Sequence, residues 1–246
     1  MERKNVVCGF VRFHPLITLP EERFADTGCL VQHGETVSID LGLPEKEVWR
    51  KMRKGHRYDI KKFRKMGFEV QMDSEWEKFD DFIEIYGQTM HRLGASDYYF
   101  FPCDYFIQLR EVLGNHLHLC TVTLDDKVAG VGLFTEICGI VQYHRAGVHD
   151  DFLDNQPSKL MLNFVRCWAK QRGNRVLHLG GGVGGGEDSL FRFKAGFSKL
   201  RHPFYTWRVI AIPEIYGELV REWEKATGVD ADGMEGFFPA YRKTLA

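Results

Sequence analysis

Hydrophobic and polar positions follow two different periods in the central part of the chain. The period is two over residues 117–124, 128–137 and 140–148, which are separated by turns at Asp125-Asp126 and Cys138-Gly139. Short turns between such segments predict three consecutive antiparallel strands. The period then changes to that of a helix over residues 158–172, whose apolar face holds Leu160, Met161, Phe164, Val165 and Trp168.

The segments on either side of this meander complete the prediction. Helical patterns precede it at residues 74–94, where Ser74 and Glu77 form a capping-box signal, and at residues 104–113. A short apolar strand at residues 176–179, a strand at residues 204–212 and a helix from Pro213 follow it. A meander followed by a β-α-β crossover predicts an α/β fold with a mixed sheet and helices on its faces. It does not predict the regular alternation of a doubly wound sheet.

The N-terminal part predicts strands within residues 6–19, 29–41 and 68–70, and one helix that Pro44 opens and Gly67 ends. That helix is strongly basic. Asp59 is the only acidic residue from 50 to 65, and the cations are Arg50, Lys51, Arg53, Lys54, Arg57, Lys61, Lys62, Arg64 and Lys65. Such a run is usually a solvated face. It could instead grip RNA phosphates, although the overall net charge of −1 does not point to a nucleic-acid partner.

The remaining composition limits the protein class. The 246 residues, 44% of them hydrophobic, predict one large globular domain or one and a half. The N-terminal residues are charged and then strand-like, and no apolar run approaches the roughly 20 residues that span a bilayer. Six scattered cysteines form no CxxC pair and no metal-binding spacing. We therefore expect a cytoplasmic protein without membrane insertion and without a metal.

A glycine-rich run is the most distinctive segment. Six glycines lie between Leu179 and Asp188, directly after the short apolar strand. Glycines there allow positive φ and close approach of the backbone to a ligand. A dinucleotide or methyl-donor turn is the weakest interpretation, because such turns follow the first strand of a βαβ unit. A flexible loop without a ligand and a loop beside a substrate groove are the other two.

The residues that follow this run carry a family resemblance. Leu179-Gly-Gly-Gly together with Asp188-Ser189-Leu190-Phe191-x-Phe193-Lys194-x-Gly196-Phe197 closely resembles the signature of FemAB-like transferases, which are built from GNAT-fold domains. Further matches occur in the family's order at Val11-Arg-Phe-His-Pro15, Arg57-Tyr-Asp-Ile60-Lys-Lys, Tyr86…Thr89-x-x-Arg92, Tyr143-x-x-Ala146-Gly147, Trp168-Ala169 and Phe237-Phe-Pro-Ala-Tyr-Arg242. The chain differs in its shorter first half, in Lys61-Lys62-Phe63 where Arg-Lys-Ala is usual, and in lacking a coiled-coil arm.

The resemblance implies a GNAT-like acyltransferase fold with an incomplete N-terminal GNAT-like half. Residues 1–72 would be a partial first subdomain with the basic helix, and residues 73–246 the complete acyltransferase domain. The implied reaction forms an amide by transferring an aminoacyl or acyl group to an amine, on a small molecule or a cell-envelope precursor such as that of peptidoglycan. The donor would be aminoacyl-tRNA or acyl-CoA, and no cofactor would be bound tightly. A binding module that retains the fold without turnover is the rival from another class.

Candidate catalytic residues follow from the needs of acyl transfer. Polarisation of the acyl carbonyl by a fixed cation is usually the largest contribution. Lys194 lies between Phe193 and Phe197, and the resemblance places the family's catalytic lysine there, whereas an exposed lysine on a short helix is the alternative. Asp188 is either the general base for the amine or the cap of the following helix.

Other candidates would bind the substrates. Strand alternation predicts that Tyr143 and Arg145 point to one side and His144 to the other. Arg145 suits a carboxylate or a phosphate, and Tyr143 could instead be a core residue whose hydroxyl is satisfied. Arg92 could hold a pyrophosphate or complement its helix end. The substrate-binding candidates are Arg92, Tyr143, Arg145, Gly181, Gly182 and Ser189. The donor-binding candidates form two pairs. Ser158 and Lys159 lie at a helix start that lacks the glycine-rich pattern of coenzyme A enzymes. Lys61 and Lys62 could contact tRNA.

Overall fold

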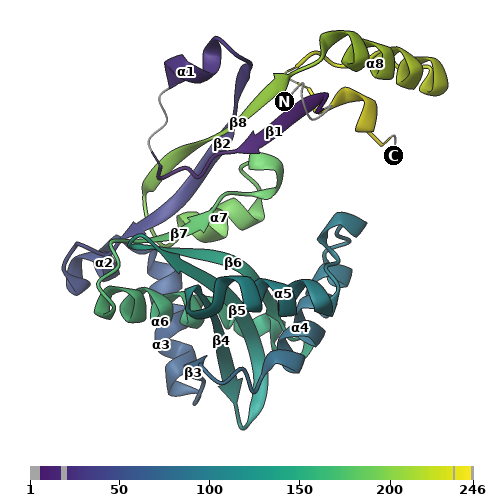
Figure 1. Ribbon diagram of the computed structural model, residues 1–246. Coiled ribbons are helices and arrows are strands. Elements are labelled where there is room, and N and C mark those ends of the chain that lie inside the picture. Colours follow the sequence, from purple (N-terminus) through teal and green to yellow (C-terminus); the bar gives the residue numbers. More distant parts are fainter. Residues whose placement is uncertain (1–5, 18–20, 235, 245–246) are drawn as a thin grey trace. The chain divides into compact units, whose positions relative to one another are not determined.

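The computed structural model describes residues 6–17, 21–234 and 236–244, which form two compact units (Figure 1). The larger unit comprises Val37–Gly181 and Asp188–Arg201, and the smaller one Met1–Thr36, Gly182–Glu187 and His202–Ala246. The predicted boundary between residues 72 and 73 falls within strand β3 (Glu69–Asp73) of the larger unit. The assignment of residues 1–72 to a partial GNAT-like subdomain stays a prediction.

A mixed sheet forms the centre of the larger unit. Strands β4 (Leu117–Leu124), β5 (Lys127–Ile137) and β6 (Ile140–Val148) are the predicted antiparallel meander, and β3 pairs antiparallel with β4. On the other side β6 pairs in parallel with β7 (Val176–Gly180), which pairs antiparallel with the end of β2 (Cys29–Asp40). The prediction of an α/β fold with a mixed sheet is confirmed.

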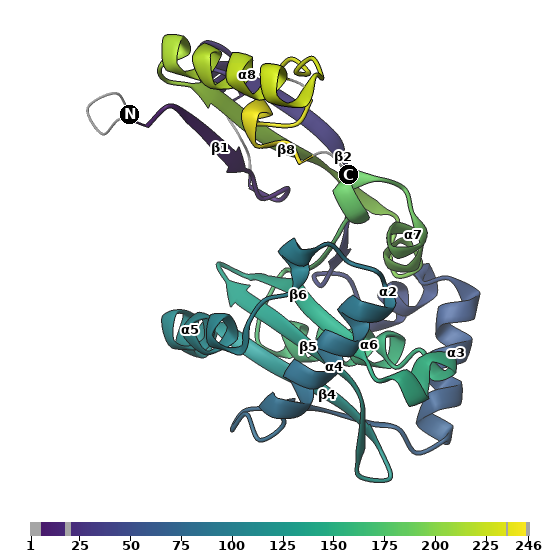
Figure 2. The same ribbon diagram turned by 90° about the vertical axis from the view of Figure 1, so that its right-hand side faces the viewer.

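Helices cover both faces of this sheet (Figure 2). On one face α4 (Phe79–Arg92) and α5 (Cys103–Leu113) pack on Val131 and Leu133 of β5. On the other, α3 (Lys54–Lys65) and α6 (Ser158–Gln171) share a core with Ala129 and Phe134 of the same strand. The alternation of β5 thus supplies both cores, and each fully buried large apolar side chain contributes about 1.5–3 kcal/mol.

Two local predictions about helices were wrong. The basic helix is divided into α2 (Glu45–Lys51) and α3, because Met52 and Arg53 are extended. Met52 is buried, and the Arg53 N–H donates to the carbonyl of Gly196 at 2.7 Å, so these contacts outweigh helix continuation. The Ser74 capping box does not form. Asp73 instead accepts hydrogen bonds from the backbone N–H of Lys78 at 2.7 Å and of Glu77 at 3.1 Å.

The smaller unit contains β1 (Cys8–Arg12), β8 (Leu200–Ile210), the start of β2, α1 (Glu21–Ala25) and α8 (Pro213–Thr227). β1 pairs antiparallel with β8, which is also a neighbour of β2. The strand expected within residues 6–19 is thus shortened to β1, and its part at residues 18 and 19 lies outside the described residues, as do residues 1–5.

Part of the glycine-rich run packs in this smaller unit. A Cβ on Gly34 of β2 would lie 2.0 Å from the carbonyl oxygen of Gly185, and one on Gly185 would lie 2.9 Å from the carbonyl oxygen of His33. Glycine is therefore required there for backbone packing on β2. Over the described part of the chain, no helix has both the length and the apolar character needed to cross a membrane.

Candidate active site

A seven-residue helix of the larger unit, α7 (Ser189–Ala195), carries the predicted catalytic lysine. Its start is fixed by Asp188, whose carboxylate accepts the backbone N–H of Phe191 at 2.7 Å. Of the two roles predicted for Asp188, the structure contains the helix cap. Ser189 is exposed as the first residue of the helix.

A histidine that sequence reasoning missed holds α7 against α3. The Nε2–H of His56 donates to the carbonyl of Phe193 at 2.9 Å, and its ring contacts those of Phe193 and Phe197. A Cβ on Gly196 would lie 2.3 Å from His56 Nε2, so only glycine fits at this position. No pattern in the sequence links His56 to α7, because the two are separated by more than 130 residues.

Lys194 is buried and directed at the end of β7. The residue is only 8% exposed, and its Nζ donates a hydrogen bond to the carbonyl of Gly181 at 2.7 Å. Gly180, with φ of +78°, lets the lysine approach, since a Cβ there would lie 3.3 Å from Nζ. Burial lowers the pKa of Lys194 to about 8, against a smaller opposing effect of the Asp188 carboxylate. The predicted residues Lys194, Asp188 and Gly181 thus lie together, whereas Gly182 belongs to the smaller unit.

The parallel strands β6 and β7 pair over only three residues, from Ile140 with Val176 to Gln142 with His178. Just beyond, β6 contains a bulge, because Phe134 of β5 pairs with Tyr143 and Leu133 pairs with Arg145. The extra residue, His144, places Tyr143 and Arg145 on opposite faces of the sheet. The prediction that these two side chains share one side was therefore wrong.

Tyr143 contacts the start of α6. Its ring stacks on Phe134 with centroids 5.3 Å apart, and its hydroxyl forms a hydrogen bond with Ser158. Burial raises the pKa of Tyr143. The predicted donor-binding residue Ser158 and the predicted substrate-binding residue Tyr143 therefore contact each other.

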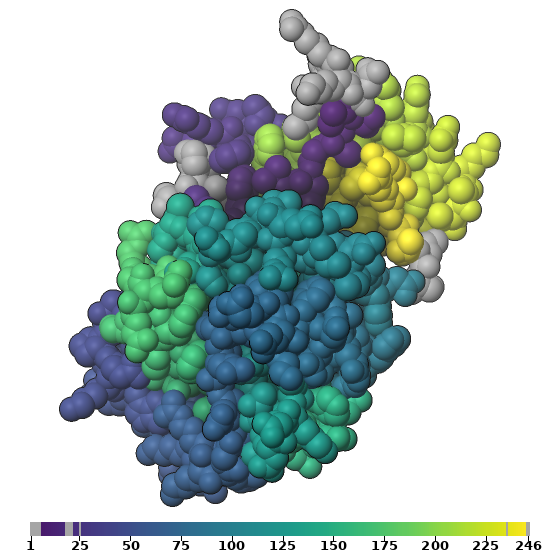
Figure 3. Space-filling view, turned by 60° about the horizontal axis from the view of Figure 1, so that its bottom comes forward, coloured from purple at the N-terminus to yellow at the C-terminus, as the bar shows by residue number. Residues whose placement is uncertain are grey.

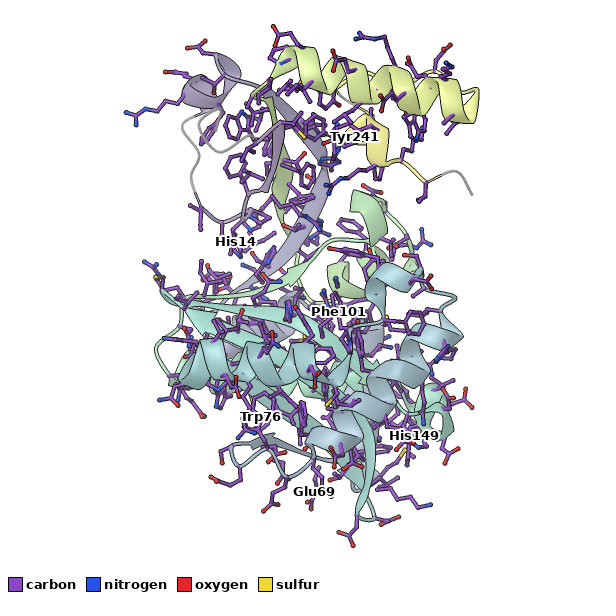
Figure 4. All side chains as sticks on the ribbon, turned by 45° about the vertical axis from the view of Figure 1, so that its right-hand side comes forward. His14, Glu69, Trp76, Phe101, His149 and Tyr241 are labelled. Carbon is purple, nitrogen blue, oxygen red and sulfur yellow. The ribbon has the colours of Figure 1, made fainter. Side chains whose placement is uncertain are left out.

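Arg145 lies on the opposite face of the sheet, with its guanidinium 4.9 Å from the ring centroid of Phe101, which Figure 4 labels. It also forms a hydrogen bond with Tyr86. Its Nε is buried and has no hydrogen-bond partner among the described residues, and the same is true of His144 Nε2. Burial lowers the pKa of His144 to about 4. An incompletely satisfied guanidinium beside aromatic rings suits a carboxylate ligand.

The remaining predicted cations have other contacts. Lys159 is 8% exposed, and its Nζ forms an ion pair with Asp59 of α3 at 2.6 Å. Arg92 pairs with Asp150 and donates to the carbonyl of Val148 at 3.3 Å, so it joins α4 to the end of β6. Lys61 and Lys62 are exposed on α3. The blue segment of the chain around α3 lies at the surface in Figure 3. Neither Lys159 nor Arg92 therefore offers an unpaired charge to a donor phosphate.

Two cavities of the larger unit, about 290 and 490 Å³ in volume, are lined by residues other than Lys194. Within the described ranges, no three His, Cys, Asp or Glu residues are grouped so that they could hold a metal ion. The chemistry that this arrangement offers is that of a desolvated amine fixed against a glycine backbone.

Comparisons with known proteins agree with this fold. A family model described as an acetyltransferase (GNAT) domain matches residues 50–194, which is more than half of the chain and ends at Lys194. A search of curated proteins found no match.

Solved structures with a similar fold include FemX, with 14% identity, a TM-score of 0.63, and 75% of this chain matched to 63% of that one. The C-terminal domain of a protein assigned as a lysylphosphatidylglycerol synthetase from Agrobacterium fabrum is 12% identical, with a TM-score of 0.57 and 85% and 70% of the two chains covered. L-PGS from Bacillus licheniformis is 12% identical, with a TM-score of 0.52 and coverage of 76% and 64%. The chain thus spans less than two thirds of FemX. These similarities show a shared fold. The family match shows more: the chain belongs to the GNAT acetyltransferase family.

Proposed function

We propose that this GNAT-family protein is an acyltransferase that forms an amide, with Lys194 polarising the acyl carbonyl of the donor. The observation that carries the proposal is the buried Nζ of Lys194, fixed by the Gly181 carbonyl at 2.7 Å. An ammonium group has three N–H donors, so two remain for a ligand oxygen. A fixed donor in a site without water stabilises developing negative charge much more than the same donor in water.

The reaction that we propose is ordinary acyl transfer. The nitrogen of a neutral acceptor amine forms a bond to the acyl carbon, and negative charge develops on the carbonyl oxygen beside Lys194. The bond from the acyl carbon to the leaving oxygen or sulfur then breaks, and the proton that the amine loses passes to that leaving atom, directly or through water. Asp188 would act mainly by fixing α7, since its carboxylate already accepts the Phe191 N–H.

Two donors fit this reaction, and the contacts at the start of α6 favour aminoacyl-tRNA. At that start, Lys159 is already paired with Asp59, so its charge is not available to a coenzyme A pyrophosphate. The residues just before the helix would also repel the pyrophosphate, because they include three carboxylates, Asp150, Asp151 and Asp154. The exposed cations of α3, among them Lys61 and Lys62, suit an RNA backbone instead. Acyl-CoA stays the second candidate, because the chain belongs to an acetyltransferase family.

For the acceptor we propose an amine that also carries a carboxylate, on a small molecule or a cell-envelope precursor. Arg145 would bind that carboxylate through its incompletely satisfied guanidinium, with Phe101 and Tyr86 as aromatic walls. A bidentate contact of this kind also fixes orientation.

The test is donor binding by the purified protein. Acetyl-CoA and, separately, aminoacylated and uncharged tRNA would be titrated at low and moderate salt. We expect salt-sensitive binding that prefers aminoacylated tRNA, and weaker binding by Lys61→Ala combined with Lys62→Ala. Lys127→Ala, at an exposed lysine at the start of β5, is the matched control and should bind as the unaltered protein does.

Micromolar binding of acetyl-CoA without binding of tRNA would replace the aminoacyl donor with acyl-CoA. Binding of neither donor would contradict the proposed reaction.

A further inference from the structure

A cationic cavity lies in the larger unit on helices that do not carry Lys194. Its volume is about 290 Å³, and α2, α3 and α6 line it with Glu45, Lys46, Trp49, Arg64, Asn163 and Arg166. Cavities for drug-sized ligands have volumes of about 300–1,000 Å³. This one therefore suits a small charged group rather than a whole nucleotide cofactor.

Arg166 is a fixed charge in the wall of this cavity. Its side chain is only 2% exposed, and Nε and Nη2 donate to Asn163 Oδ1 at 3.1 and 2.9 Å. Asn163 is itself buried, so the guanidinium is held in one orientation. A buried, oriented guanidinium is the usual binding group for planar or tetrahedral anions.

Glu45 supplies the anion that Arg166 now contacts. Its Oε1 accepts from Arg166 Nη2 at 2.7 Å, and this hydrogen bond lowers the pKa of Glu45. Although it pairs with a buried cation, the Glu45 side chain is 54% exposed. A carboxylate at the surface can rotate into water, so an incoming anion can take its place without unfolding α2.

The cavity has more positive charge than Glu45 can neutralise. Lys46 and Arg64 are exposed, and within the described part of the chain neither has an ion pair or a hydrogen bond from its side chain. Three cations thus face one carboxylate, in a protein whose net charge is −1. Two positive charges in excess fit a dianion, which a phosphate monoester is near neutral pH.

We propose that this cavity binds a phosphate monoester, in competition with Glu45. The phosphate contacts Arg166, Arg64 and Lys46, and the half-buried ring of Trp49 packs against the carbon skeleton of the ester. The proposal goes beyond acyl transfer and does not depend on it, because its residues and its test are separate from those of Lys194.

The experiment measures binding of ribose 5-phosphate, ribose and inorganic phosphate to the full chain by calorimetry at low salt. We expect ribose 5-phosphate to bind most tightly, inorganic phosphate more weakly because it lacks the contact with Trp49, and ribose not at all. Moderate salt should weaken the binding, since the exposed cations are screened. Equal affinity for the phosphate ester and inorganic phosphate would overturn the ester assignment.

Variants decide whether the built cavity is responsible. Arg166→Gln should weaken binding about tenfold or more, the size expected for loss of a charged hydrogen bond. Because this change could also destabilise the fold, the exposed residues provide the second arm. Arg64→Gln should weaken binding several-fold and Glu45→Gln should tighten it, while Lys127→Gln, outside the cavity, should leave it unchanged. Weaker binding by Glu45→Gln, or no binding of any phosphate, would overturn the proposal.

Discussion

Lys159 and Lys194 are two lysines of the larger unit that are buried to the same extent, each 8% exposed, yet their surroundings differ. Lys159, at the start of α6, meets the carboxylate of Asp59 at 2.6 Å. Lys194, on α7, donates to the neutral carbonyl of Gly181 at 2.7 Å and forms no ion pair among the described residues, although the Asp188 carboxylate opposes the lowering of its pKa. A paired charge joins two helices, whereas an unpaired one has a lowered pKa and lies ready to interact with a ligand.

The two helices that carry these lysines differ in the same way. α6 has 14 residues, and Leu160, Met161 and Val165 anchor it in the core. α7 has seven residues and is positioned by a cap from Asp188, a hydrogen bond from His56 and the close fit of Gly196. Burial of Lys194 without a carboxylate partner therefore lowers stability, and the unit retains it on a helix whose position depends on a few specific contacts.

Replacement of Lys194 should have the largest effect. Lys194→Met keeps the length of the side chain and removes the charge, so we expect the rate of acyl transfer to fall about 10²- to 10³-fold, as when one oxyanion donor is lost. The free energy of unfolding in urea should not decrease, because an uncompensated buried charge is removed. Lys199→Met, at an exposed lysine five residues on, is the control. An active Lys194→Met protein would show that Lys194 is as structural as Lys159.

The contrast between these two lysines could be predicted only in part from the sequence. The meander, α6 and the α/β class follow from periods of two and 3.6, which are local properties. The family resemblance pointed to Lys194. The ion pair of Lys159 joins residues 100 positions apart, and nothing in the local pattern of α6 indicates Asp59. Lys159 was therefore predicted to bind the donor, and only its contacts show that its charge is already paired.

The same limit explains the other differences. A bulge at His144 adds one residue to β6 and reverses the side of Arg145, and strand alternation alone gives no sign of it. The break at Met52 and Arg53 within a continuous basic run results from contacts with the core and with Gly196. Long-range packing decided each of these positions against the local propensity.

Replacement of Lys159 should affect stability instead of catalysis. Lys159→Met leaves the Asp59 carboxylate without its cation, and loss of one partner of a fully buried pair costs about 3–5 kcal/mol. Because the Asp59 side chain is 26% exposed, we expect a smaller decrease in the free energy of unfolding, about 1–3 kcal/mol. Urea unfolding measures this change.

The double variant Asp59→Leu with Lys159→Met should recover part of that loss, since both charges are then absent. Lys61→Met, at an exposed lysine of the same helix as Asp59, is the control for stability. Activity per folded molecule should stay within a few-fold of the original. A loss of donor binding at unchanged stability would restore the predicted donor role of Lys159.

The smallest effect concerns the carboxylate beside Lys194. If the ammonium form of Lys194 polarises the acyl carbonyl, the rate falls above its pKa of about 8, approaching tenfold per pH unit. Since the Asp188 carboxylate raises this pKa, Asp188→Asn should move the midpoint of the pH–rate profile to lower pH by less than one unit. The asparagine oxygen can still accept the Phe191 N–H and cap α7, so the rate at pH 7 should change by less than tenfold.

The pH dependence of stability gives an independent readout of the same pKa. Because the folded pKa lies below the unfolded value of about 10.5, the unfolded chain binds more protons between pH 8 and 10.5, and the free energy of unfolding should rise over that window. Lys194→Met should abolish this rise and Asp188→Asn should start it at lower pH. A uniform hundredfold loss of rate in Asp188→Asn, with an unmoved midpoint, would instead identify Asp188 as the general base.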